Sequence, residues 1–422
     1  MALKNDIKEE QKELILIDDI KEELSGKDLL QATAPRRIAS IDFVKGIAII
    51  FIILCHTSAA WFDSDWVFLH GIVYSFLDIL GPSLFIFLSA LAVIFSIKRK
   101  QGRLPEKVIR NQIFSRGFMV IFIGMIINVI LVSDQYIFPL SLWGWNIIMF
   151  IGFSQIFCYY ALKLNRIPRV IVGIIIIFTS EIILEVLLTG RNSNFIYAIL
   201  YFIVVSPEAT VTLLPWLSIC FISTIFGEYL YEAMIEGTDE AYRGLFKTFV
   251  IWGLIFTVFG VFTGLESVVR GNGVDPGTIN GALYWHIYLL DIANMQPFTD
   301  FPGMWKFLIR GTFANMWYNI GAGLLILAVG FYIVDIKRKS NIFTGVIDYY
   351  GKVSLNLFLV HYLFLPVFMG LFSIFYFPYL CLAYIAFLGF LFYFWNKYAN
   401  GAGTPEWLMM QVMNIGKKKP KK

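Results

Sequence analysis

Long apolar runs separated by short polar segments dominate the chain. Ten of these runs approach or exceed the roughly 20 residues that cross a bilayer as a helix. They lie at about 41–61, 71–97, 115–133, 143–162, 169–189, 211–231, 247–265, 313–335, 349–373 and 376–396. The pattern predicts an all-α fold, a polytopic transmembrane helical bundle of about ten spans.

One further apolar run, 194–206, is about a dozen residues long and ends before Pro207. That length is short for a span, so we interpret the run as a re-entrant or interfacial segment on the outer side. If it does cross the membrane, the count becomes eleven and another predicted span must change.

Basic residues gather after the even-numbered spans. By the positive-inside rule, these clusters and both termini are predicted to be cytoplasmic. The clusters are Lys98–Lys100 with Arg103, Lys107 and Arg110; Lys163, Arg166 and Arg169; Lys337–Lys339; and the five lysines in 417–422.

Three regions follow from this pattern. Residues 1–37 form a charged cytoplasmic N-terminal tail without a signal-peptide core, 38–396 form the transmembrane domain, and 397–422 form a basic cytoplasmic C-terminal tail.

The chain is 58% hydrophobic and 15% charged, against about 25% charged in a soluble protein. The net charge of +4 is small and lies in loops, which argues against nucleic-acid binding. The four cysteines lack metal-ligand spacing, so no metal is expected.

The first predicted span carries Asp42, Lys45 and His56. Eleven residues separate Lys45 from His56, which returns a helix to within about 20° of its starting direction, so the two share a face about 16 Å apart. Asp42 lies one turn below on nearly the same face. Ionisable groups in a membrane helix are functional candidates. The alternative is that Lys45 extends toward the membrane surface and His56 is a hydrogen-bonded packing residue.

Two further groups are candidates. Asp78 lies inside the second span, where it could orient a histidine or neutralise a cation, and His70 at the start of that span is either functional or an interfacial aromatic. Ser354, Asn356 and His361 follow Gly351-Lys352 in the ninth span. They are candidates for substrate contact, with interhelical hydrogen bonding as the alternative. The long outer stretch 266–312 is either a binding loop or an interfacial aromatic belt.

These segments together resemble the membrane acyltransferase superfamily that includes the acyltransferase-3 enzymes and heparan-α-glucosaminide N-acetyltransferase. Arg37–Gly46 is similar to the opening R-x-x-x-(I/L)-D-x-x-(R/K)-G motif, and Asp78–Ser89 to the second-helix motif. Pro215-Trp216 with Gly227-Glu228 resembles the later PW…GE elements, and Gly351–His361 resembles GK-x-SL-x-x-(Y/F)-x-x-H. The resemblance spans about 36–395.

The resemblance implies an enzyme that moves an acyl group, usually acetyl, from cytoplasmic acyl-CoA to a sugar, glycan or glycolipid on the far side of the cell membrane. Lys45 and His56 fit the basic–ten residues–His spacing of the acyltransferase-3 branch, whereas His70 stands near the important histidine of the other branch. We favour His56 as the base, with Asp78 or Asp42 positioning the basic groups. Lys45 replaces the more usual Arg.

Acyl-CoA phosphates are expected to meet the basic groups at the inner mouth, namely Arg37, Lys45, Arg99 and Arg116. The resemblance implies acetyl-CoA as the donor, and a homodimer is left open by the sequence. Two other hypotheses stay open: a proton-coupled small-solute transporter that uses Asp42, Asp78 and His56 as a relay, and a non-catalytic scaffold. The acceptor, N- or O-transfer and the acyl length are left open by the sequence.

Overall fold

The computed structural model describes residues 38–131, 138–205, 212–268 and 290–414. Arg37 and the whole stretch 269–289 of the long outer segment lie outside the described residues. In the described part nearly all regular structure is helical, and the two short strands β1 (Ser267–Val268) and β2 (Met304–Trp305) pair antiparallel.

The helices follow in chain order. They are α3 (Ala39–Trp61), α4 (Val67–Leu77), α5 (Pro82–Lys100), α6 (Glu106–Leu131), α7 (Ile147–Ala161), α8 (Arg166–Gly190), α9 (Phe195–Val204), α10 (Leu213–Glu236), α11 (Asp239–Thr263), α14 (Phe313–Phe331), α15 (Ile342–Lys352), α16 (Ser354–Phe364), α17 (Phe377–Ala399) and α18 (Pro405–Asn414). Short 3₁₀ segments are η1 (Asp78–Leu80), η2 (Leu140–Leu142), η3 (Lys306–Leu308) and η5 (Leu365–Phe368), and η4 (Tyr332–Ile336) is a π-helical turn.

Within the described residues, eight helices are long and apolar enough to cross a membrane, α4 to α5 counting as one span. All ten predicted spans contain helix, but two of them are not a single continuous helix long enough to cross a membrane. The span predicted at 143–162 is the 15-residue α7, because Asn146 accepts a hydrogen bond from the Met149 amide and caps the helix there. The span predicted at 349–373 breaks at Val353, where α15 and α16 meet at 80°.

Helix α9 covers most of the short apolar run predicted not to cross the membrane. Its 10 residues extend about 15 Å, half of a hydrocarbon core of about 30 Å. The indoles of Trp143 and Trp145 donate hydrogen bonds to the carbonyls of Phe202 and Ile203 at the end of α9. The length of the helix agrees with that prediction.

The helices divide into central and peripheral ones. In the apolar window of α4 to α5, 78% of residues are buried, whereas in α8, α11 and α17 the share is 28% or less. The outer face of α8 exposes an apolar stripe at helical spacing, with Ile167, Ile171, Ile175, Phe178 and Ile182 each at least 50% exposed. Such a continuous apolar outer face is typical of helices that contact lipid. The chain is thus a multi-pass membrane protein.

Helix α15 crosses α3 in close contact because of two glycines. A Cβ at Gly46 would overlap the main chain of Ile347, and a Cβ at Gly351 would overlap the main chain of Asp42. Only glycine permits backbones to approach this closely. The crossing brings the start of α16 beside the first turns of α3, where Asp42 and Lys45 lie.

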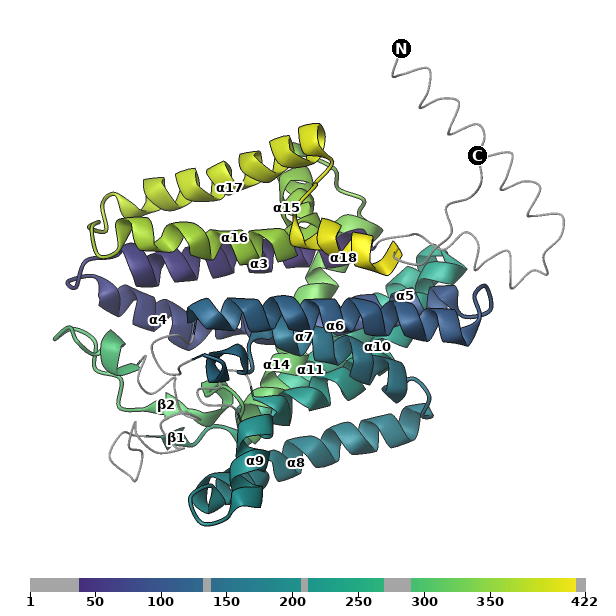
Figure 1. The fold of residues 1–422 in the computed structure, drawn as a ribbon, viewed down its shortest axis with the longest axis horizontal. Helices are drawn as coiled ribbons and strands as arrows, with labels where there is room; N and C mark the ends of the chain where they lie inside the picture. The colour runs from purple at the N-terminus through teal and green to yellow at the C-terminus, as the bar shows by residue number, and fades with distance from the viewer. Residues whose placement is uncertain (1–37, 132–137, 206–211, 269–289, 415–422) are drawn as a thin grey trace.

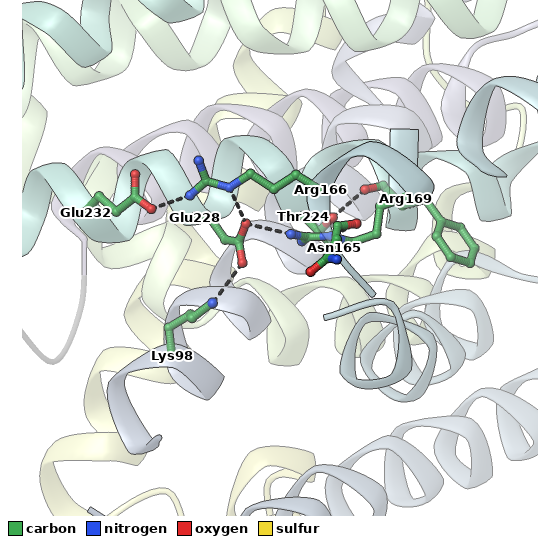
Figure 2. Close-up of polar contacts among 8 residues, drawn as sticks. Lys98, Asn165, Arg166, Arg169, Thr224, Glu228 and Glu232 are labelled. Atoms are coloured by element: carbon green, nitrogen blue, oxygen red, sulfur yellow. Dashed lines mark hydrogen bonds and ion pairs between the residues drawn. The ribbon is translucent and has the colours of Figure 1, made fainter. Parts of the chain in front are cut away.

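A buried carboxylate joins three helices at one end of the bundle. Glu228 of α10 accepts hydrogen bonds from Lys98 of α5 (2.8 Å) and from Arg166 (3.0 Å) and Arg169 (2.7 Å) of α8, as Figure 2 shows. We call this end of the bundle the basic end and the opposite one the far end. Helices α15 and α18 lie at the basic end and β1 and β2 at the far end (Figure 1).

We predict that Glu228→Gln destabilises the fold strongly. Breaking a buried ion pair leaves uncompensated charge and costs about 3–5 kcal/mol in the free energy of unfolding. The measurement is thermal unfolding in detergent, followed by tryptophan fluorescence. Glu232→Gln is the matched control: its side chain also pairs with Arg166 but is 55% exposed, and we expect only a small change. Equal melting temperatures for the two variants would contradict the prediction.

Candidate active site

Two cavities lie in succession along α3. The basic-end cavity, of about 110 Å³, is lined by Asp42, Lys45 and residues of α5, α6, α7, α15, α16 and α18. The far-end cavity, of about 180 Å³, is lined by His56 with residues of α4, α6, α7, η1, α16 and the segment before α14. Three apolar side chains, Ile147, Ile148 and Phe358, line both cavities. They form a shared apolar wall between the two.

The unbroken α3 places Lys45 and His56 as their spacing predicted. Lys45 lines the basic-end cavity and His56 the far-end cavity, eleven residues or about 16 Å apart along one helix. Asp42, one turn before Lys45, is 7% exposed and lines the same cavity as the lysine. Asp42 and Lys45 thus line one cavity, and His56 lines the next one along α3.

The basic-end cavity combines side chains of both charges. Arg116 of α6 and Ser354 of α16 line it together with Lys45, and Glu406 of α18 adds a carboxylate. Sequence analysis predicted that 397–422 is a tail. Within this segment, helix α18 packs against α6 and α16. Arg99, at the end of α5, does not line the cavity.

His56 is hydrogen-bonded to a second histidine. Its Nδ1 lies 2.7 Å from Nε2 of His361, and the two rings are inclined by only 7°. Its Nε2 lies 3.4 Å from the hydroxyl of Tyr362, which also lines the far-end cavity. His361 is fully buried, and its Nδ1 lies 3.0 Å from the carbonyl oxygen of Leu357. The structure thus places His361 behind His56 and outside the lining of the cavity.

The rival histidine His70 has a different environment. Its Nδ1 lies 3.0 Å from the hydroxyl of Ser58, which donates a hydrogen bond to the Cys55 carbonyl. His70 is 7% exposed and is not among the residues that line the far-end cavity. The two histidines are therefore distinguished by access to the cavity, which His56 has.

Asp78 forms a buried two-pronged ion pair with Arg310. The guanidinium Nε donates to Oδ2 (3.0 Å) and Nη2 donates to Oδ1, and both side chains are 8% exposed. Of the two roles predicted for Asp78, the structure shows the neutralisation of a cation. Sequence analysis missed Arg310. The signal was present, because an arginine three residues before an apolar span needs a carboxylate partner.

Asparagines on α14 hold the segment that carries Arg310. Asn315 accepts from the Gly311 amide (3.1 Å) and donates to the Phe307 carbonyl (2.9 Å). Asn319 donates both to Asn315 (2.8 Å) and to Ser83 of α5 (2.8 Å). This ladder fixes the main chain on both sides of Arg310 and joins it to α5.

Other polar residues line the far-end cavity or were predicted to contact substrate. Tyr74, Tyr362 and Asn146 line the far-end cavity and were not identified from the sequence, where single aromatic or amide residues carry little signal. Asn356, a predicted substrate residue, is 2% exposed and lines neither cavity, and its Oδ1 has no hydrogen-bond partner within the described ranges. Among the residues that the structure describes, no group of three His, Cys, Asp or Glu is placed to hold a metal.

We predict that Asp78→Asn and Arg310→Gln each lower stability sharply, because each leaves the partner's charge buried without compensation, at a cost of about 3–5 kcal/mol. The double variant should regain a large part of this loss. A double-mutant cycle on thermal unfolding measures the coupling between the two side chains. Simple additivity of the two losses would show that the pair does not act as a unit.

Comparison with known proteins identifies the family. No curated protein matches the chain. A family model described as heparan-alpha-glucosaminide N-acetyltransferase, catalytic, matches residues 37–259, more than half of the chain. The matched region holds Lys45, His56, His70 and Asp78 and ends before Arg310 and His361, so the resemblance of the later Gly351–His361 segment lies outside it. The chain therefore belongs to the family of the heparan-alpha-glucosaminide N-acetyltransferase catalytic domain.

Proposed function

We propose that the protein transfers an acyl group, acetyl in keeping with its family, from acyl-CoA at the basic end to a hydroxyl or amine of a sugar or glycan at the far end. The observation that carries this proposal is the pair of cavities along α3. Lys45 and Arg116 line one cavity, His56 lines the other, and Ile147, Ile148 and Phe358 line both.

The basic-end cavity supplies what an anionic donor needs. Lys45 and Arg116 offer positive charge within a site that also holds Asp42 and Glu406. A guanidinium can bind a phosphate through two parallel hydrogen bonds, and an ammonium acts as a compact point charge. A cavity of about 110 Å³ is too small for a whole nucleotide. We therefore place the nucleotide at the mouth and the narrow thioester arm along α3 toward the shared wall.

The far-end cavity supplies the chemistry. The His56 imidazole takes the proton of the acceptor hydroxyl or amine, whose oxygen or nitrogen attacks the thioester carbonyl. The carbon–sulfur bond breaks, and the thiolate of CoA takes the proton back from His56. In a ping-pong route His56 itself carries the acyl group before the acceptor attacks. Both routes need an unprotonated ring nitrogen that faces the cavity, and they place Tyr74 and the Asp78–Arg310 pair beside the acceptor.

The orientation follows from charge. Because basic clusters of membrane proteins favour the cytoplasm, the basic end faces the cytoplasmic pool of acyl-CoA and the far end faces outward. We place the protein in the cell membrane with both termini in the cytoplasm. This orientation gives the transfer a direction, from an inner donor to an outer acceptor.

The competing transporter hypothesis is less well supported. A proton relay would have to connect Asp42 with His56, but the wall between their cavities is apolar, with Ile148 1% and Phe358 6% exposed. Asp78, the third member of that relay, is paired with Arg310. The family match also favours acetyl transfer. Uptake driven by a pH gradient in liposomes without CoA would revive the transporter hypothesis.

We predict that His56→Ala lowers kcat for acetyl transfer by roughly 10²–10⁴-fold, the contribution of a general base, while His70→Ala changes kcat much less at a matched folded fraction. The measurement uses purified protein in liposomes with radiolabelled acetyl-CoA and glucosamine-ended or hydroxyl-ended oligosaccharides. Full activity of His56→Ala would exclude His56 as the base. If the wild-type protein transfers acetyl to none of these sugars, the proposed function is wrong.

We also predict that acetyl-CoA raises the melting temperature and that Lys45→Ala and Arg116→Ala shrink the shift. A ligand that binds only the folded state stabilises it by about 2.7 kcal/mol at 100 times its Kd. Lys339→Ala is the matched control, because it removes an exposed basic residue that lines neither cavity. If acetyl-CoA raises the melting temperature of Lys45→Ala and Arg116→Ala as much as that of Lys339→Ala, the donor does not bind beside Lys45.

A further inference from the structure

The hydrogen-bonded chain behind His56 determines where its proton lies. The chain runs from the Leu357 carbonyl to Nδ1 of His361 (3.0 Å), and from Nε2 of His361 to Nδ1 of His56 (2.7 Å). A carbonyl oxygen only accepts, so Nδ1 of His361 carries the hydrogen in this chain. In a neutral His361, Nε2 is then an acceptor, and Nδ1 of His56 must be the donor.

This assignment leaves one nitrogen of His56 with a lone pair. With the proton on Nδ1, the acceptor nitrogen is Nε2, on the side of the Tyr362 hydroxyl and the far-end cavity. That is the nitrogen a general base must present to the incoming hydroxyl or amine. The opposite tautomer would place a hydrogen where the acceptor's proton has to go.

We propose that His361 is a positioning residue that holds His56 in the tautomer with its proton on Nδ1 and its basic nitrogen toward the far-end cavity. The inference rests on the proposed function, because it specifies how the proposed base is kept ready. The partner that a ring nitrogen hydrogen-bonds fixes the tautomer of a histidine in this way.

The surroundings of His361 suit this role. Its side chain is fully buried, and the Tyr384 hydroxyl donates to its main-chain carbonyl (2.6 Å), which ties α16 to α17 at this residue. The near-coplanar rings let the Nδ1–H of His56 point along the lone pair of His361. When His56 takes the acceptor's proton at Nε2, the same bond becomes charge-assisted and therefore stronger. The proton then leaves with the CoA thiol, so the cycle needs no further reactant.

Two variants of His361 separate positioning from packing. His361→Phe keeps a ring but removes the acceptor, and His361→Gln keeps an acceptor oxygen. We expect His361→Phe to lower kcat by roughly 10–100-fold, the usual effect of losing such a supporting partner, with an unchanged KM for acetyl-CoA. His361→Gln should recover most of the kcat. The matched control is Tyr350→Phe, which removes another buried hydrogen bond to α17, at the Ile385 carbonyl, and should leave kcat unchanged.

The tautomer itself has a direct readout that does not depend on activity. ¹⁵N NMR of histidine-labelled protein distinguishes a protonated Nδ1 from a protonated Nε2, and single variants assign the four histidines. We expect Nδ1 of His56 to be protonated in the wild type and in His361→Gln, and the other tautomer to grow in His361→Phe. A wild type with Nε2 of His56 protonated, or an active protein whose kcat is unaffected by His361→Phe, would overturn the inference. A wild type without transferase activity but with the expected tautomer would instead overturn the proposed function.

Discussion

Every ionisable group carried into the apolar bundle needs a partner, and the arrangement of the site depends on this requirement. Such a group left alone in a membrane interior is expensive, and removing one member of a buried pair costs more than the pair contributes. Asp78 meets Arg310, which is 232 residues away in the chain, and His56 meets His361 at a distance of 305 residues. Each pair joins α3 or the η1 turn to the C-terminal half, so the contacts that hold the helices together also build the far-end cavity.

The length of the apolar runs was sufficient to predict helix in all ten spans, and helix geometry predicted the face shared by Lys45 and His56. Helix α3 is continuous from Ala39 to Trp61, so the distance and relative direction of Lys45 and His56 follow from helix geometry. Their spacing alone therefore predicted that the candidate site extends along α3. Two predicted spans, 143–162 and 349–373, differ from the observed helices because of local features of the chain. Asn146 starts α7 through a cap, and the bend at Val353 leaves no trace in mean hydropathy because both sides of it are apolar.

The partners of the site residues could not be predicted from the sequence for a different reason. Periodicity gives the face on which a side chain lies but does not give the helix opposite to it. Arg310 lies in a segment without helical periodicity, and its position depends on the Asn315 and Asn319 ladder on α14. His361 was recognised as a candidate for substrate contact, yet the sequence did not show that its helix packs against α3. Such contacts depend on how helices that are hundreds of residues apart in the chain pack against one another.

The two candidate histidines differ in what their rings contact, and His70 is part of the contact between α3 and α4. His70 donates from Nδ1 to Ser58, whose own hydroxyl is directed to the Cys55 carbonyl, so this imidazole is engaged in joining α4 to α3. That contact lies about two turns before Asp78, which pairs with Arg310. In the proposed function His56 acts by facing the far-end cavity, whereas the hydrogen bond of His70 joins α4 to α3.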